Sequence, residues 1–304
     1  MNPLILTATS VLRSLQRISK CDLPSLDGSA AETSGLSSSG DFSSLTIHAA
    51  SLPGLTSPGL AGTFEDERLN VAFTSGLRWL LALVDARADD VALDVAAGTG
   101  LVARALATGV LRVVAVDSTA AMLAQGRRSA CAEGHRNVVF VSGRAERLPF
   151  ADGAYTLVLT RFSLHHFADP RPPVAELARV CRPGGRVVVK DLVASSDPAT
   201  AARQDRVERL RDPSHVRMAP PGAVRGWLHE HGLRIERVAE REIDRPVEAW
   251  LEQALTEPAA AAQVRKAFAA ELAGGEPTGM RPHLADDGAM WFRQRWEATV
   301  ARRP

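Results

Sequence analysis

Lysine and tyrosine are almost absent from this chain of 304 residues. Three lysines stand among 36 basic residues, one tyrosine occurs, and the formal net charge is only +1. A chain this close to neutrality has no overall field that would attract nucleic acid or an anionic membrane. It also lacks the basic, aromatic-studded stripe that is typical of nucleic-acid binding. The composition therefore argues against nucleic acid or a membrane as the partner and leaves the oligomeric state open.

Cysteine and long apolar runs are scarce as well. Cys21, Cys131 and Cys181 have no spacing typical of a metal or redox site, so we expect no metal and no oxidising compartment. No apolar run approaches the roughly 20 residues of a transmembrane helix. Residues 3–12 lack the basic leader and the cleavage site of a signal peptide. These absences predict a cytoplasmic protein, and a hydrophobic content of 45% is ordinary for a globular core.

The first 62 residues differ in composition from the rest. Ser, Gly and Pro dominate residues 24–62, and such a segment buries too little apolar surface to offset the entropy lost on ordering. We predict a disordered or loosely ordered extension over 1–62 and one globular domain over 63–304. The extension is either dispensable or a flap that orders over the substrate, and its composition favours the first alternative.

Beyond residue 63, stretches of helix and strand character alternate. A helix over 64–86 is expected as a cap over the site, because its apolar residues recur at helical spacing. Strands are expected near 91–95, 111–116, 138–141, 155–160, 186–191, 233–240 and 290–301. Further helices are expected near 101–107, 119–131, 171–181, 247–255 and 258–272, with two more over 197–231. This alternation predicts an α/β fold with helices on both faces of a parallel sheet.

The most informative segment is VALDVAAGTGL at 91–101. It predicts a buried strand and then a turn at Gly98 and Gly100, which lack a Cβ and let the backbone approach a ligand. Such a turn indicates a nucleotide-type cofactor. It also fits a loose dinucleotide fingerprint, since Asp117 lies 19 residues after Gly98. Asp94 argues against a nicotinamide cofactor, because a carboxylate within the strand must be hydrogen-bonded and could meet a cationic ligand.

Four motifs follow one another at regular spacing, LDVAAGTG at 93–100, AVDS at 115–118, GRAERLPF at 143–150 and LARVCRPGG at 177–185. Together they resemble the class I S-adenosylmethionine (SAM) methyltransferases over residues 64–240, in particular the ubiquinone and menaquinone C-methyltransferase branch. The resemblance implies a Rossmann-like, doubly wound, seven-stranded sheet, mostly parallel with an antiparallel last strand. It also implies SAM as cofactor, S-adenosyl-L-homocysteine (SAH) as product, and methyl transfer to a small-molecule acceptor in quinone or secondary metabolism.

The resemblance assigns cofactor contacts to these motifs. Asp94 and the 96–100 turn would hold the amino-acid end of SAM, and Asp117 would accept hydrogen bonds from both ribose hydroxyls. Two alternatives stay open, Asp117 as the N-cap of the next helix and Met122 as core filling rather than an adenine contact. The candidate cofactor-binding residues are Asp94, Ala96, Gly98, Thr99, Gly100, Asp117, Ser118, Met122, Arg144, Ala145, Glu146 and Arg161.

Arg144 departs from the family pattern. Most relatives carry Asp there to accept from the adenine amino group, and arginine has only donors. Its guanidinium could stack on the ring or turn to solvent, while the N–H of Ala145 could still contact adenine. The departure keeps a second class of function open, a SAM-binding protein that catalyses a cyclisation or rearrangement without methyl transfer. A nicotinamide-dependent oxidoreductase is the third class.

Candidate catalytic groups follow two neighbouring strands of the expected sheet. His166, in the loop RFSLHHF at 161–167, is predicted as the general base, with Asp191 as the partner that orients its imidazole. His165 is the second candidate, and both histidines could instead be scaffold residues that line the cofactor. A histidine base favours a hydroxyl or an acidic carbon as the acceptor atom.

The segment near 195–222 is expected as an insert beside the acceptor. Its loop RDPSHVR at 211–217 is either a wall of the acceptor pocket or a polar helix-to-helix turn. The residues at 212–214 have turn chemistry and favour the second alternative.

Overall fold

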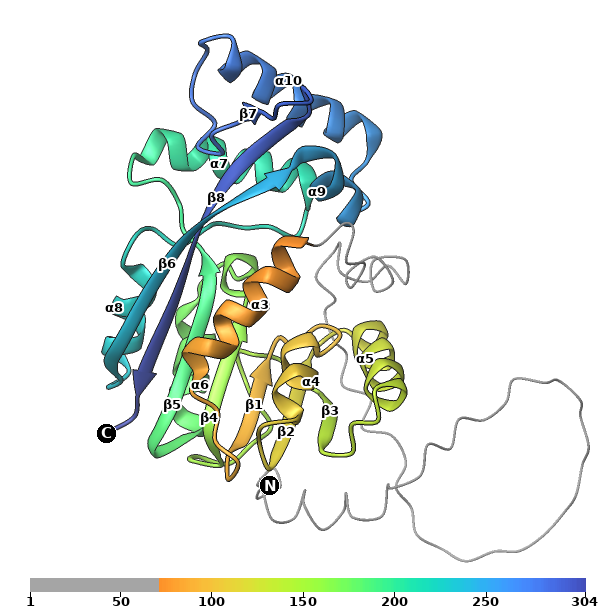
Figure 1. Cartoon of the computed structure of the whole chain (residues 1–304). Helices are drawn as coiled ribbons and strands as arrows, with labels where there is room; N and C mark the ends of the chain where they lie inside the picture. The colour runs from red at the N-terminus through yellow and green to blue at the C-terminus, as the bar shows by residue number, and fades with distance from the viewer. Residues whose placement is uncertain (1–70) are drawn as a thin grey trace, which may run out of the picture.

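The computed structural model describes residues 71–304, so the predicted extension over 1–62 lies outside the described residues. Its centre is a sheet of strand order β3-β2-β1-β4-β5-β8-β6, with β7 paired to β8 (Figure 1). The strands are β1 (Val91–Val95), β2 (Arg112–Asp117), β3 (Val138–Ser142), β4 (Tyr155–Arg161), β5 (Cys181–Leu192), β6 (Arg234–Pro246), β7 (His283–Leu284) and β8 (Met290–Arg302). β1 to β5 are parallel, and β8 is antiparallel to β5 and β6. The expected doubly wound sheet with an antiparallel last strand is confirmed.

Two details of the sheet differ from the prediction. β6 continues to Pro246 instead of ending near 240, and the two-residue strand β7 is added to the seven expected strands. The second half of β6 pairs with β8 through cross-strand ion pairs such as Arg293 with Asp244, at 2.7 Å. Paired charges stabilise adjacent strands but remove the apolar alternation by which a strand is recognised in sequence.

Three helices cover one face of the sheet, α3 (Val71–Val84), α4 (Leu101–Ala107) and α5 (Ala120–Ala132). Leu80, Leu106 and Leu123 from these helices pack in one cluster with strand residues such as Leu157. The described part of the helix expected over 64–86 therefore lies on a face of the sheet.

The opposite face is covered by α6 (Arg171–Val180) and α8 (Ala223–Glu230). Leu177 of α6 and Leu228 of α8 pack there in one cluster with Val187 of β5. The next residue of β5, Val188, belongs to the first face, because successive side chains of a strand point to opposite sides. Strands covered on both faces are continuously apolar, which is why their positions were predictable.

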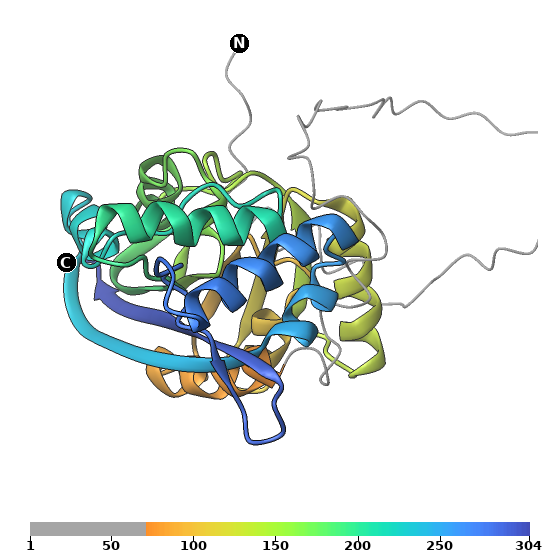
Figure 2. The ribbon, with the colours of Figure 1, turned by 90° about the horizontal axis from the view of Figure 1, so that it is seen from above.

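The helices that lie above the carboxyl ends of the parallel strands are α7 (Pro198–Arg211), α9 (Val247–Gln253) and α10 (Pro258–Leu272) (Figure 2). Trp250, Phe268 and Phe292 form the centre of a separate core there, with Trp250 and Phe292 ring centroids 4.5 Å apart. The helical cover of the strand ends thus comes from the expected insert and the C-terminal region. No helix within residues 71–304 has the length and apolar character needed to cross a membrane.

Candidate active site

A cavity of about 190 Å³ lies between the carboxyl ends of the strands and this helical cover. Its walls come from β1 and the turn that follows it, the start of α5, the loop after β4, α7 with its loop, and the adjoining parts of β6, α9 and β8. In open parallel sheets ligands bind beyond the carboxyl ends of the strands. The cavity is therefore the candidate active site, and it joins the predicted cofactor segment to the predicted catalytic segment.

The turn after β1 follows a left-handed backbone path. The φ angles are 54° at Ala96, 58° at Gly98 and 72° at Gly100. A Cβ on Gly100 would lie 2.6 Å from the Phe140 ring, so the turn requires glycine there. This path brings Ala96 and Gly98 to the cavity wall.

Asp94 is a buried carboxylate in the cavity wall. Its Oδ2 accepts a hydrogen bond from the Ala103 N–H at 3.0 Å, which ties β1 to α4. Burial raises the pKa of Asp94 to about 7, although the Ala103 N–H and the charge of buried Arg161 oppose the shift. A cation brought into this end of the cavity would favour the ionised carboxylate.

Asp117 joins two loops at the end of β2. Its Oδ2 accepts from the Gly98 N–H and its Oδ1 from the Thr119 N–H, both at 2.8 Å. Thr119 is the N-cap residue of α5, so Asp117 fixes both the glycine turn and the start of that helix. Because a carboxylate oxygen accepts more than one hydrogen bond, the partly exposed Asp117 can still bind a ligand from the cavity wall.

Other predicted cofactor residues differ in their access to the cavity. Met122 and Arg161 are buried side chains in its wall. Thr99 is fully buried, and Ser118 is exposed; neither lines the cavity.

The segment after β3 lies outside the cavity lining. Arg144 is about half exposed and pairs with Glu146 at 2.8 Å, whereas Ala145 packs into the main core. Of the two alternatives for Arg144, the structure therefore has the guanidinium turned to the surface.

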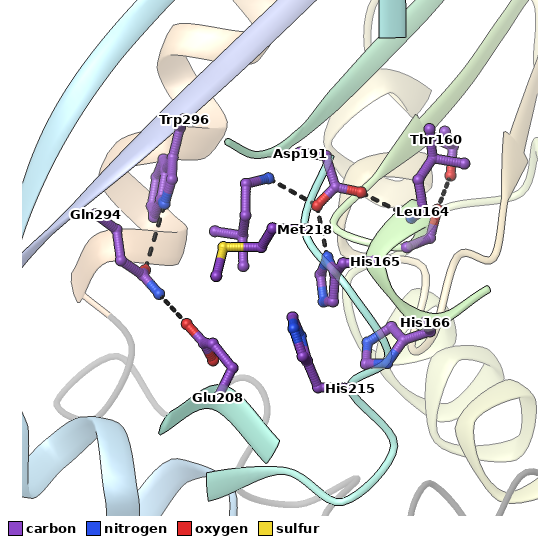
Figure 3. Close-up of polar contacts among 12 residues, drawn as sticks. Thr160, Leu164, His165, His166, Asp191, Glu208, His215, Met218, Gln294 and Trp296 are labelled. Carbon is purple, nitrogen blue, oxygen red and sulfur yellow. Dashed lines mark hydrogen bonds and ion pairs between the residues drawn. The ribbon is translucent and has the colours of Figure 1, made fainter. Parts of the chain in front are cut away.

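The structure corrects the predicted pairing of the catalytic groups (Figure 3). Asp191 Oδ1 lies 2.5 Å from Nδ1 of His165, not His166. The carboxylate also accepts from the Leu164 and Leu192 N–H groups, both at 2.7 Å. These bonds fix the carboxylate and, through it, the ring of His165, which lines the cavity.

The His165–Asp191 pair changes the pKa of both groups. Burial lowers the pKa of His165, but the charge and hydrogen bond of Asp191 outweigh it, and the net shift is upward. Burial likewise raises the pKa of Asp191, but His165 and the two backbone N–H groups reverse the shift. The pair therefore favours a basic imidazole beside an ionised carboxylate.

His166 has different partners. Its Nδ1 lies 3.1 Å from both the carbonyl oxygen and the Oγ of Ser214, in the loop after α7. Burial, followed by the charge of His165, lowers the pKa of His166 to about 4. The two histidines are adjacent in the 3₁₀ turn η1 (Leu164–His166), and their differing partners give them different chemistry.

The loop at 211–217 is a wall of the site, contrary to the preference for a plain polar turn. Its Val216 and Arg217 N–H groups donate to the carbonyl oxygen of His165, at 2.9 and 3.1 Å. His215 stacks on His165 with ring centroids 5.3 Å apart, while its Nε2 lies 2.8 Å from Asp205 Oδ1. Sequence reasoning missed His215, since turn chemistry at the neighbouring residues masked it.

Sequence reasoning also missed the end of the cavity remote from the glycine turn, which we call the far end. It is formed by Glu208, Arg211, Arg245, Gln253, Gln294 and Trp296. The period-two pattern of 290–301 did place Gln294 and Trp296 on one face of their strand. Arg211 begins the loop at 211–217, which was considered as a possible pocket wall. Glu208, Arg245 and Gln253 gave no signal, because they reach the cavity from α7, β6 and α9 through tertiary packing.

Comparison with known proteins agrees with this arrangement. The methyltransferase domain family matches residues 93–189. The uncharacterised methyltransferase YcgJ of Bacillus subtilis is 31% identical over 195 residues, or 64% of this chain and 76% of that protein. The demethylmenaquinone methyltransferase of Beutenbergia cavernae is 36% identical over 142 residues, or 43% of this chain and 57% of that protein.

Solved structures share the fold. The crystal structure of YcgJ matches with a TM-score of 0.68 and 26% identity, covering 76% of this chain and 98% of that chain. The [4+2]-cyclase SpnF matches with a TM-score of 0.55 and 17% identity over 76% of this chain and 80% of its own, a likeness of fold alone. Strand order, motif order and a relative matched over three-quarters of its length together show that the chain belongs to the class I SAM-dependent methyltransferase family.

Proposed function

We propose that this protein transfers a methyl group from SAM to a small-molecule acceptor, with His165 as the general base. The observation that carries the proposal is one continuous cavity, lined by the glycine turn, by His165, which Asp191 holds from behind, and by the far end. The family supplies the reaction class, and the arrangement of this chain's residues supplies the roles.

The residues around the glycine turn fit SAM. Asp94 is a buried carboxylate whose pKa is raised to about 7. The ammonium group of the amino-acid moiety of SAM would lower this pKa again and pair with the ionised carboxylate. Asp117 and Met122 lie in the same wall, where they would meet the ribose and the adenine. When bound, SAM supplies an electrophilic methyl group on a sulfonium.

His165 accepts the proton that the acceptor loses as it attacks. Asp191 holds Nδ1–H, so that Nε2 is the basic atom, and it stabilises the imidazolium that forms. His166 and the loop at 211–217 shape the wall beside this base. The rest of the catalysis is alignment of acceptor and methyl group, together with the exclusion of water.

The first test is calorimetric titration of the full chain with SAH, with NADH as a control ligand. We expect saturable SAH binding and no NADH binding. Transfer of a labelled methyl group from SAM to an acceptor, with SAH released, then establishes the reaction. Turnover of an acceptor without SAH release would support the cyclisation alternative, and tight NADH binding would support an oxidoreductase.

Substitution of the two histidines tests the role of the base. His165→Ala is expected to lower kcat by about 10²–10⁴-fold, because it removes a general base, while SAH affinity is retained. His166→Ala serves as the matched control and is expected to lose far less.

The pH profile gives a second readout of the same assignment. His165 must be deprotonated to act, and Asp191 raises its pKa, so the rate rises with pH through that raised value. Asp191→Asn is expected to shift this limb to lower pH. Equal losses from both alanine variants, or an unshifted limb, would contradict the role of the pair.

A further inference from the structure

Two guanidinium groups converge on one neutral atom at the far end of the cavity. Nη2 of Arg245 donates to Oε1 of Gln253 at 2.9 Å, and Nη2 of Arg211 donates to the same oxygen at 3.3 Å. Arg245 is 5% exposed and Gln253 is 2% exposed, and all three side chains line the cavity. Within residues 71–304, no carboxylate oxygen lies within 4.0 Å of a guanidinium nitrogen of Arg245 or Arg211, so neither arginine forms an ion pair there.

This convergence is electrostatically unfavourable. Burial, and after it the like charge of Arg211, lowers the pKa of Arg245 to about 9. An amide oxygen carries no formal charge, so it satisfies hydrogen bonds without neutralising either cation. Buried charges are ordinarily paired, and the far end therefore has room for a counter-charge supplied from the cavity.

Glu208 only partly supplies that charge. It is 2% exposed, and its Oε1 accepts from Nε2 of Gln294 at 2.6 Å. Oε1 of Gln294 in turn accepts from Nη1 of Arg245 at 3.3 Å, so an amide separates carboxylate from guanidinium. Asp212, on the adjoining loop, is engaged with Ser214. Asp212 lines the cavity as well, and although burial opposes the shift, the charge of Arg211 helps to lower its pKa. The two carboxylates therefore act on the two guanidinium groups only at a distance, and within residues 71–304 neither guanidinium has a carboxylate in direct contact.

We infer that the acceptor carries an oxyanion, a carboxylate or a phosphate, which binds to Arg245 and Arg211 at the far end. A guanidinium presents a planar fork of donors that matches either group. Figure 3 draws the Gln294–Glu208 pair apart from His165 and His166. Arg245 donates a hydrogen bond to Gln294, and all these residues line one cavity, so an acceptor bound to the arginines would extend toward the base. This inference rests on the proposed function, since only that function makes the far end the acceptor's site.

The test uses the full chain saturated with SAH, at constant ionic strength in chloride. Benzoate, phenyl phosphate and the neutral benzamide are titrated calorimetrically. We expect saturable binding of at least one anion in the millimolar range, as befits a small fragment, and binding of benzamide weaker by at least about tenfold. The stronger of the two anions identifies the carboxylate or the phosphate as the natural group.

Substitution of the arginines and substitution of Glu208 are expected to change the affinity for the anion in opposite directions. Arg245→Gln and Arg211→Gln are each expected to weaken anion binding by at least about tenfold, because each removes a charged donor. Glu208→Gln is expected to tighten it by about threefold or more, because it removes an opposing charge. Arg206→Gln, at an exposed position of α7, is the control and should leave the affinity unchanged.

The SAH affinity, measured for every variant, distinguishes failure of the oxyanion site from failure of the proposed function. Normal SAH binding with equal affinities for benzoate and benzamide, or with no effect of either arginine variant, overturns the oxyanion site. Failure of the parent protein to bind SAH overturns the proposed function instead. The anion titrations on the unloaded protein then still decide whether the far end binds oxyanions.

Discussion

Lys190 of β5 is a fully buried lysine surrounded by aromatic rings. Its Nζ donates to the carbonyl oxygen of Gly76 at 2.9 Å. The ring centroids of Trp79, Phe162 and Trp296 lie 5.0, 4.8 and 4.4 Å from the same atom. A Cβ at Gly76 would lie 2.7 Å from Nζ, so glycine is what allows this approach.

Replacement of Lys190 tests the cost of burying its charge. Burial, followed by the charges of Arg161 and Arg241, lowers its pKa to about 6, below the roughly 10.4 of an unfolded lysine. Between these values the unfolded chain binds more protons, so the free energy of unfolding rises with pH and levels off below about 6. Lys190→Met is expected to remove this slope, of at most about 1.4 kcal/mol per pH unit, and to stabilise the protein at pH 7.

Thermal and denaturant unfolding between pH 6 and about pH 9 measure the slope. Lys266→Met, on the exposed side of α10, is the matched control and should keep the parent's slope. A lower stability of Lys190→Met at pH 7 would mean that the three rings hold the lysine in its charged form.

At the scale of single residues, sequence predicts best where a motif fixes the backbone. Asp94 and Asp117 were placed correctly in the cavity wall because each ends or occupies a strand beside the glycine turn. Asp191 was assigned to the wrong one of two adjacent histidines, since the direction of each ring depends on η1 and on the loop that binds it. Arg245 gave no local signal at all, because only the pairing of β6 with β8 brings it to the cavity.

At the scale of elements, the glycines of α5 and α8 have very different surroundings. In α5, a Cβ on Gly126 would clash with the Phe140 ring and lie 2.5 Å from the carbonyl oxygen of Thr99. Gly126 thus lets α5 approach the glycine turn closely. In α8, a Cβ on Gly226 would meet nothing within 4 Å.

The matched alanine substitutions should therefore change the free energy of unfolding in opposite directions. Gly126→Ala is expected to lower the free energy of unfolding by about 1–3 kcal/mol, because it overpacks the contact, and to weaken SAH binding by displacing the turn. Gly226→Ala is expected to raise it by ~0.5–1 kcal/mol, since alanine favours a helix. Denaturant unfolding and SAH titration measure both effects. A stable Gly126→Ala variant with normal SAH affinity would show that α5 can move without consequence.

Element prediction succeeded where burial imposes a period. The buried parallel strands and the amphipathic helices stand close to where the apolar pattern put them, as with α10 at Pro258–Leu272. The pattern failed over the second half of β6, where one face carries Glu240 and Asp244 paired with arginines of β8 and the other face carries Arg241 and Arg245. Without apolar contrast, a strand cannot be distinguished in sequence from a polar connection.

At the scale of the whole molecule, the domain boundary remains a prediction. Among residues 71–304, those that line the cavity or fill the four core clusters run from Leu77 to Ala301. We expect a chain that begins at residue 63 to unfold at a temperature within a few degrees of the full chain and to bind SAH within about threefold. Side-by-side melting and calorimetry of the two chains measure this. A loss of SAH or acceptor affinity would assign the first 62 residues to the site.

The alternation of β8 has a consequence for redirecting the enzyme toward other acceptors. Gln294 and Trp296 face the cavity, whereas Arg293 and Arg295 face outward and pair with Asp244 and Glu240. A shift of one residue in the pairing of β8 would exchange the two sets and bring arginines to the cavity in place of an amide and an indole. The outward ion pairs thus favour the observed register, and a substitution at position 294 leaves them intact. Trp296 is fully buried against Phe162 and Lys190, so it has to be retained when position 294 is varied.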